Sequence, residues 1–156
     1  MPMPKEEFLI AMRYLAASVS VISAKNSSNK PFAMTVSSVT SLSIDPPSIL
    51  VCVNKEASIH DILRNGSDLC INILTNDQRD ISNLCSSKDL ESSRFANDFW
   101  DQAGFPYLKN AQANIFCKID ELISYHSHSI VIARVESANS SDSFNTLMYA
   151  DGGYLG

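Results

Sequence analysis

The residues most able to do chemistry lie in one short run that is rich in hydroxyl groups. Between positions 35 and 43, six serine and threonine hydroxyls are interleaved with apolar side chains; they belong to Thr35, Ser37, Ser38, Thr40, Ser41 and Ser43. The pattern is typical of a strand, yet a strand needs no side-chain hydrogen bonds for its ladder. This surplus favours a polar ligand that is poor in protons, such as a phosphate, a polyol chain or the edge of a heterocycle.

A second candidate is the turn that follows the apolar strand 48–53. It reads Asn54-Lys55-Glu56-Ala57-Ser58 and leads into an expected helix, whose free backbone N–H groups would attract anions. Taken alone, the turn favours a simpler interpretation, in which Ser58 caps the helix together with Asp61 and Lys55 is solvated. Beside the hydroxyl-rich run, a phosphate or flavin site becomes the better interpretation.

Two histidines, His126 and His128, alternate on an expected strand, which would place both imidazoles on one face. No third ligand follows at a suitable spacing, so we predict no metal site. A single histidine that hydrogen-bonds a ligand and a plain surface strand remain comparable alternatives. The pair Arg94-Phe95 and the aromatic residues up to Trp100 are interpreted as a packed aromatic lid over the core.

Several common catalytic motifs are absent. The five glycines form neither the Gly-x-Gly-x-x-Gly nor the Walker pattern that cradles nucleotide phosphates. Neither His-Glu-x-x-His nor Gly-x-Ser-x-Gly occurs, which removes the usual support for a hydrolase. The four cysteines form no Cys-x-x-Cys pair. Cys52, Cys70 and Cys117 lie in apolar runs and are expected to be buried and reduced, whereas Cys85 lies near an expected helix end.

The composition bounds the class of protein. A chain of 156 residues with 45% hydrophobic residues suits one domain with a single core, which we expect to span 1–156. The net charge of −5 and the lack of a lysine and arginine stripe exclude a general nucleic-acid binder. The nearly uncharged stretch 31–44 is too polar to span a membrane, and no secretory signal opens the chain. A cytoplasmic location is therefore expected.

The expected elements place these residues on a mostly β framework. Apolar residues at helical spacing predict a first helix over 4–15. Shorter helices are expected at 58–64 and from residue 76 or 77 to about 84, whereas 86–109 is expected to be irregular. Such elements, without regular strand–helix alternation, indicate an antiparallel barrel of six or seven strands. One strand is expected to begin at residue 19, and the others are expected at 34–44, 48–53, 69–74, 115–123, 129–138 and 147–154.

The hydroxyl-rich run is part of a longer ordered pattern. Residues 34–47 read Met-Thr-Val-Ser-Ser-Val-Thr-Ser-Leu-Ser-Ile-Asp-Pro-Pro, and Leu-Val-Cys-Val-Asn follows at 50–54. In this order the motifs resemble the flavin reductase-like FMN-binding split barrel family, which includes the reductase components of two-component flavin monooxygenases and flavoredoxin-like proteins. Further matches extend the resemblance over nearly the whole chain: Phe8-x-x-Ala11-Met12, Asn72-Ile73-Leu74, Arg94-Phe95, His128 and Gly152-x-Tyr154.

The resemblance implies a mostly β fold, in which a six-stranded antiparallel FMN-binding split barrel of Greek-key type has flanking helices. It also implies a homodimer with flavin near the interface. His128 corresponds to the histidine that lies beside the flavin and the nicotinamide, so it is the implied catalytic residue. The positions that correspond to flavin contacts are Thr35, Val36, Ser37, Ser38, Ser41, Cys52, Val53, Asn54, Lys55, Ser58, Ser86, Ser87 and Tyr154.

The implied activity is that of an NAD(P)H-dependent flavin reductase, which transfers hydride from nicotinamide C4 to N5 of FMN or FAD. NADH or NADPH would be the co-substrate, and reduced flavin would pass to a partner monooxygenase. Because the cofactor carries the difficult chemistry, no strong base is required. Two alternatives stay open: a flavoredoxin-like FMN electron-transfer protein without free-flavin turnover, and a structural relative that has lost flavin.

Three positions depart from the family pattern. Ser127 stands where an acidic residue usually precedes the histidine, and Ala133 stands where a glycine usually follows it. Asp151 stands where a basic residue usually precedes Gly152. These positions lie on the nicotinamide side, so they bear on pyridine-nucleotide preference more than on flavin binding.

Overall fold

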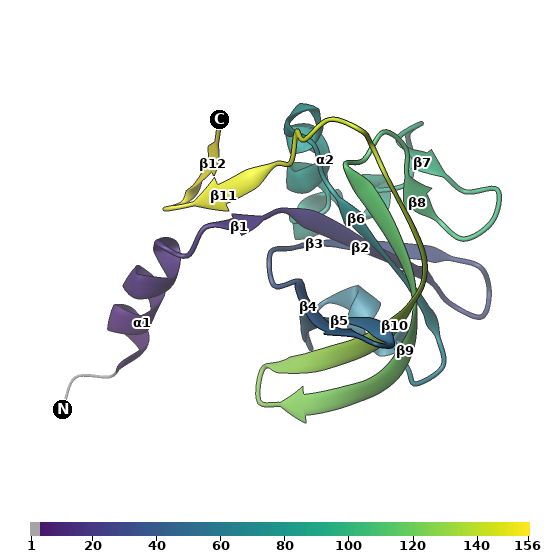
Figure 1. Ribbon diagram of the computed structural model, residues 1–156, viewed down its shortest axis with the longest axis horizontal. Helices are drawn as coiled ribbons and strands as arrows, with labels where there is room; N and C mark the ends of the chain where they lie inside the picture. Colours follow the sequence, from purple (N-terminus) through teal and green to yellow (C-terminus); the bar gives the residue numbers. More distant parts are fainter. Residues whose placement is uncertain (1–3) are drawn as a thin grey trace.

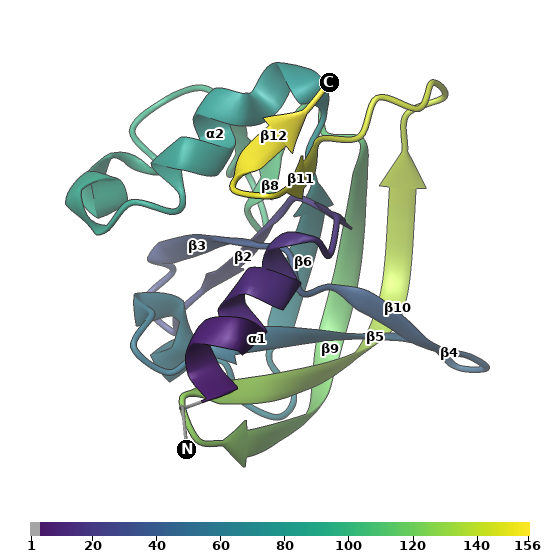
Figure 2. The same cartoon turned by 90° about the vertical axis from the view of Figure 1, so that its left-hand side faces the viewer.

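A curved antiparallel sheet forms the body of the protein in a computed structural model that describes residues 4–156 (Figure 1). Seven strands follow the order β3-β2-β6-β9-β10-β5-β4, which confirms the mostly β, antiparallel prediction. The long strands β9 and β10 run side by side along the molecule (Figure 2). The strands span Ser20–Lys25 (β2), Pro31–Val36 (β3), Thr40–Ile44 (β4), Pro47–Asn54 (β5), Asp68–Ile73 (β6), Ala113–Tyr125 (β9) and His128–Ser140 (β10).

Smaller elements surround this sheet. Both ends of the chain contribute to a second sheet, in which β1 (Ala17–Ser18) pairs with β11 (Met148–Ala150) and β11 with β12 (Gly153–Leu155). None of the helices in the described part of the chain has the length and apolar character that crossing a bilayer requires. The remaining elements are α1 (Pro4–Arg13), η1 (Ser58–Ile62), η2 (Asn76–Gln78), α2 (Arg79–Leu84), η3 (Lys88–Ser93), β7 (Trp100–Asp101) and β8 (Tyr107–Leu108).

The hydroxyl-rich run forms two strands instead of the single strand expected at 34–44. β3 ends at Val36, β4 begins at Thr40, and the two strands form opposite edges of the main sheet. Between them, the Ser38 Oγ accepts from the backbone N–H of Cys52 and donates to its carbonyl, at 3.2 and 3.1 Å. Within residues 4–156 no pairing joins β3 to β4, so the sheet is open, with seven strands where the resemblance implies six.

Helix α1 confirms the predicted first helix, although it ends at Arg13 rather than at residue 15. It stands away from the main sheet (Figure 1), and none of its residues is buried. Its last turn is held to the C-terminal hairpin, because the Arg13 Nε donates to Asp151 at 3.2 Å. A side chain at Gly152 would collide with the same guanidinium. Large apolar residues in and after the helix are therefore exposed: Phe8, Leu9, Ile10, Met12 and Leu15.

The turn at 54–58 differs from its expected form. η1 is a 3-10 helix preceded by Ala57, and no side chain caps it, so the expected cap formed by Ser58 and Asp61 is wrong. The Ser58 hydroxyl instead donates to the carboxylate of Glu91 on η3. Ser58 therefore links two segments that are distant in the sequence, and its local pattern gave no sign of that partner.

Two other boundaries also move. Thr75 caps the second helical segment through a reciprocal capping box with Gln78, rather than residue 76 or 77. The expected strand 147–154 is a hairpin, because Asp151 and Gly152 adopt φ angles of 51° and 76° and reverse the chain. The region 86–109, expected to be irregular, contains η3 and the short β7–β8 hairpin.

Apolar clusters cover both faces of the sheet at β2. Ile22 and Ala24 belong to the cluster enclosed by the curved sheet, whereas Val21 belongs to a second cluster with Trp100 and Leu147. Successive side chains of a strand point to opposite faces, so both faces of β2 are buried. This double burial explains why β2 lacks the alternation of apolar and polar residues that marks a half-exposed strand.

The cysteines follow the prediction with one exception. Cys70 and Cys117 are buried as expected, and Cys85 is buried as well, whereas Cys52 is only half-buried. Burial removes water from the thiolate form and raises the pKa of the Cys70, Cys85 and Cys117 thiols to about 12. Near Cys85 the Arg94 guanidinium opposes this effect without cancelling it.

The raised pKa values of these thiols predict that the protein loses stability in alkali. Above pH 9 the thiols of the unfolded chain ionise, whereas the folded chain keeps its protons up to a pKa of about 12. The free energy of unfolding therefore falls as the pH rises through this window, by about 1 kcal/mol per thiol at pH 10. Urea unfolding at pH 8 and pH 10 should show a lower midpoint at pH 10; a constant midpoint would contradict the prediction.

Candidate functional site

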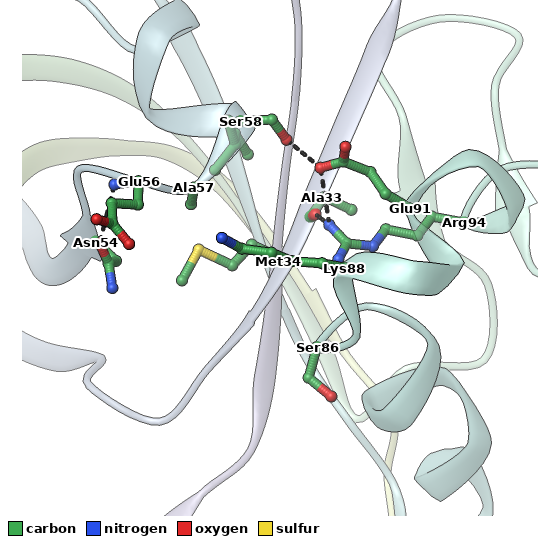
Figure 3. A pocket seen from close by; sticks show the side chains of 11 residues that line it. Ala33, Met34, Asn54, Glu56, Ala57, Ser58, Ser86, Lys88, Glu91 and Arg94 are labelled. Carbon is green, nitrogen blue, oxygen red and sulfur yellow. Dashed lines mark hydrogen bonds and ion pairs between the residues drawn. The ribbon is translucent and has the colours of Figure 1, made fainter.

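Two adjoining cavities lie beside β3. The first has a volume of about 460 Å³ and lies between the turn 54–59 and η3 (Figure 3). The second has a volume of about 440 Å³, and Ser86 lines both. The first is lined by Ala33, Met34, Asn54, Glu56, Ala57, Ser58, Ile59, Ser86, Lys88, Glu91 and Arg94. The second is lined by Val19, Thr35, Val36, Ser37, Ser82, Asn83, Ser86, Tyr149, Gly152, Gly153 and Tyr154.

Arg94 is the best-anchored charge in the first cavity. Only 7% of this residue is exposed. Its guanidinium donates to the carbonyls of Ala33, Ser87 and Leu84 at 2.7, 2.9 and 3.3 Å. These carbonyls come from two segments, β3 and the connection from α2 to η3, so they fix the plane of the guanidinium and compensate part of its desolvation. The expected aromatic lid is present, since Phe95 packs on Trp100 with centroids 4.4 Å apart, but Arg94 itself faces a cavity.

The first cavity combines this buried cation with other charges and hydroxyls. Lys88 extends across it towards Met34 (Figure 3) and forms no ion pair with any residue in 4–156. Glu91 lies 3.7 Å from the guanidinium of Arg94. Cationic and hydroxyl donors that converge in one cavity can bind a phosphate through charge-assisted hydrogen bonds.

The second cavity has more aromatic character. Tyr149 and Tyr154 meet edge to face with their centroids 5.5 Å apart. The Tyr154 hydroxyl lies 2.8 Å from the Ser82 Oγ and 2.8 Å from an oxygen of Asn83, which fixes the ring against α2. Thr35 is also anchored to α2, because its hydroxyl donates to the Ser82 carbonyl at 2.7 Å. A flat aromatic ligand with a polar edge suits this arrangement.

The structure brings together about half of the predicted flavin contacts. Asn54, Ser58 and Ser86 line the first cavity. Thr35, Val36, Ser37, Ser86 and Tyr154 line the second. The length of β5 separates the hydroxyl-rich run from the turn at 54–58 in the sequence. The two segments nevertheless meet at one place, because β3 passes between η1 and α2. This meeting of the two candidate segments agrees with the sequence analysis.

The other predicted contacts lie outside the linings of these two cavities. Val53 is fully buried, and its side chain packs in the core instead of facing either cavity. Lys55 directs its ammonium group to the hydroxyl of Ser124 on β9, away from the first cavity. Ser41 lies on the edge strand β4. Three more take structural positions: Ser38 and Cys52 bond to each other, and the Ser87 carbonyl accepts from Arg94.

The two histidines do not share a strand face as expected. His126 lies in the turn between β9 and β10 with a φ of 49°, and its ring packs against Tyr125. His128 opens β10 opposite Asn54, so it lies next to the first cavity without lining it. Its Nδ1 lies 2.8 Å from the Ser127 hydroxyl. No group of three or more metal-binding side chains is found in the described residues.

Comparison with known proteins assigns the chain to a family. The family profile described as flavin reductase like domain matches residues 12–156. The chain belongs to this family. It is 36% identical to the reductase component of FADH(2)-dependent resorcinol hydroxylase of Rhizobium sp. (strain MTP-10005), over 96% of this chain and 85% of that protein.

Two further flavin reductases are similar to this chain. An FMN reductase (NADH), RutF, of Stutzerimonas stutzeri (strain A1501) is 34% identical over 99% of this chain and 90% of that protein. The solved structure of the styrene monooxygenase flavin reductase (SMOB) from Pseudomonas putida S12 superposes with a TM-score of 0.82 and 27% identity. The superposition covers 96% of each chain.

For this flavin reductase-like chain, sequence reasoning passed over several residues that line the cavities. Arg94 is interpreted as part of a lid and matches the family pattern, but neither Arg94 nor Lys88 is among the predicted contacts. Two serines precede Arg94 and Phe95 follows it, so its neighbours in the sequence do not mark its guanidinium as buried. No local signal marks three others, which line the cavities only because distant segments pack together: Glu91, Ser82 and Asn83.

Proposed function

We propose that this chain is an NAD(P)H-dependent flavin reductase that supplies reduced FMN or FAD to a partner monooxygenase. The observation that carries the proposal is the buried, carbonyl-anchored guanidinium of Arg94 in a cavity that adjoins a second, tyrosine-lined cavity. The names of the relatives support flavin reduction with NADH, and one of them names a hydroxylase as the partner system.

The residues present fit a flavin. In the proposed site, Arg94, Lys88, Ser58 and Ser86 hold the phosphate in the first cavity. The ring lies in the second cavity against the backbone of 35–37 and beside Tyr154. Three of the six remaining predicted contacts support this site indirectly: Ser38 and Cys52 fix the link between β3 and β4, and Ser87 orients Arg94.

The protein's part in the reaction is to position the flavin and to exclude water from the site. When bound, the flavin supplies the hydride-accepting chemistry. The protein groups around it are anchored in advance, because Thr35 and Tyr154 are both hydrogen-bonded to α2. Since these bonds use the hydroxyl protons, the two side chains fix the shape of the second cavity instead of donating to the ring. Such a site requires no strong base, which agrees with the absence of a catalytic triad in the sequence.

His128 is the proposed catalytic residue on the nicotinamide side. This role follows from the resemblance; its pairing opposite Asn54 places His128 next to the first cavity, although it lines neither cavity. We expect His128→Ala to slow hydride transfer from NADH about tenfold to a hundredfold while the Kd for FMN stays within about twofold. Stopped-flow measurement of flavin reduction tests this, with His126→Ala as the control because His126 lies in the exposed turn two residues earlier. A weaker FMN affinity with unchanged hydride transfer would contradict the assignment.

The assay for the function itself is NADH or NADPH oxidation with increasing free FMN. A saturating dependence on added FMN is expected of a reductase. A flavoredoxin-like electron-transfer protein would keep its flavin and show no such dependence. A colourless protein that fails to bind added FMN would contradict both flavin functions, and would leave only a structural relative that has lost its cofactor.

We also infer a homodimer with the flavin site near its interface. The exposed apolar residues of α1 support this arrangement, as do Leu42 and Ile44 on the edge strand β4. A second copy of the chain would cover these residues; sedimentation velocity that gives the mass of one chain would contradict it. We further propose that residues 1–156 form a single split-barrel domain, and the family match over 12–156 supports the single domain. The proposed location of the protein is the cytoplasm.

A further inference from the structure

One oxygen atom of Glu91 lies at the centre of the contacts in the first cavity. This atom, Oε1, accepts the hydrogen bond from the Ser58 hydroxyl and lies 3.7 Å from Nη1 of Arg94 (Figure 3). A single carboxylate oxygen thus joins a hydroxyl donor on η1 to a buried cation that follows η3. An oxygen of a phosphate group could accept the same hydrogen bond from Ser58 and lie beside the same cation.

We propose that Glu91 is an internal competitor for the flavin phosphate. Its carboxylate holds the contacts to Ser58 and Arg94 that a phosphate would need, so it must turn away before the phosphate of FMN can bind both residues. The inference rests on the proposed function, because it assumes that the first cavity receives that phosphate.

Charge explains why the two anions cannot share the position. The first cavity is lined by two cations, Lys88 and Arg94, and by two carboxylates, Glu56 and Glu91. A phosphate monoester brings between one and two further negative charges at neutral pH. At contact distance in a partly buried site, a second anion beside Glu91 would be repelled.

The side chains of Arg94 and Glu91 differ in how freely they can move. Arg94 is fixed by three backbone carbonyls and is buried, so it stays in place. The Glu91 side chain is 51% exposed, and its carboxylate reaches water by rotation about its own side-chain bonds. Phosphate binding therefore exchanges one anion for another at a fixed cation, and the free energy of the contacts that Glu91 gives up is subtracted from the binding of FMN.

Such competition weakens phosphate binding without touching the ring. A flavin that is held less tightly leaves faster, because differences in affinity within one site arise mainly from the rate of release. Rapid release suits a reductase whose product is used by another enzyme. Glu91 would thus help to make FMN an exchanging substrate instead of a resident cofactor.

Removal of the charge tests the proposal. Glu91→Gln keeps a group that can hydrogen-bond Ser58 but no longer pairs with Arg94. We expect the Kd for FMN to fall about fivefold to tenfold and FMN release after dilution to slow by a similar factor. The Kd for riboflavin, which has the same ring and no phosphate, should change less than about twofold. Flavin fluorescence during titration reports both values.

Glu56→Gln is the matched control, since Glu56 lines the same cavity and pairs with no cation among the described residues. An equal gain in FMN affinity from Glu56→Gln, or an equal gain for riboflavin, would overturn the proposal. In an Arg94→Met background Glu91→Gln should give a smaller gain, because the cation for which the two anions compete is gone, and an undiminished gain would also overturn it. Wild-type protein that binds neither FMN nor riboflavin would instead overturn the proposed function.

Discussion

Replacement of Arg94 by methionine is expected to raise the Kd for FMN roughly 30-fold to 100-fold, because a charge-assisted contact to phosphate is lost. Methionine fills much of the same volume but cannot bond the phosphate. Riboflavin should keep most of its affinity, since Arg94 lines the first cavity and not the tyrosine-lined one. Isothermal titration with the two ligands gives the comparison.

The substitution also removes bonds from the carbonyls of Ala33, Leu84 and Ser87, so some stability is lost. Riboflavin binding serves as the check that the variant remains folded at the temperature of the titration. Lys88→Met is the matched control, because Lys88 lines the same cavity and has no ion-pair partner among the described residues; we expect a change of about threefold to fivefold. An Arg94→Met variant that binds FMN as tightly as the wild type would refute the phosphate site.

Asn72 should be the side chain whose loss costs most in stability. It is fully buried on β6. Its amide nitrogen donates to the Val21 carbonyl at 2.8 Å and to the Ser23 hydroxyl at 3.1 Å. Its oxygen accepts from the Leu108 backbone N–H at 2.9 Å and from the Asn114 amide at 2.8 Å. One side chain thus ties β6 to β2, β8 and β9.

We expect Asn72→Leu to lower the free energy of unfolding by about 3–4 kcal/mol, because leucine has a similar volume but leaves buried donors and acceptors unsatisfied. Equilibrium unfolding in urea gives the value. Asn139→Leu makes the same change at an exposed position of β10 and should cost less than about 1 kcal/mol. Equal effects of the two substitutions would show that the buried network contributes little.

The elements that local patterns specify were predictable from the sequence. The helical spacing from Phe8 onwards predicts α1, and the apolar runs at 48–53 and 69–74 predict β5 and β6 to within one residue. The break in the hydroxyl-rich run was not predictable, because both halves have the pattern of a strand. It depends on the bond between Ser38 and Cys52, which joins separate segments.

The candidate site was predictable in its location and less so in its charges. The resemblance implies a flavin contact at Lys55, whereas the local pattern alone favours a solvated side chain. Its ammonium group bonds Ser124 instead, because the backbone of Lys55 continues towards the β9–β10 hairpin, where its N–H donates to the Ser127 carbonyl. Lys88 and Arg94 take the positions in the first cavity, and the guanidinium of Arg94 is anchored by two carbonyls of the preceding segment and by the distant carbonyl of Ala33.

The open sheet has two edges that differ in what they offer to another polypeptide. An edge strand with free N–H and C=O groups is a template for strand addition and aggregation. On β3 two of these groups are already used, since the Ala33 carbonyl accepts from Arg94 and the Thr35 N–H donates to the Cys85 carbonyl. Among the described residues β4 pairs only with β5, and it is exposed along its whole length. Extension of the sheet by an incoming strand is therefore hindered at β3 and open at β4, and the same guanidinium that faces the first cavity protects the β3 edge.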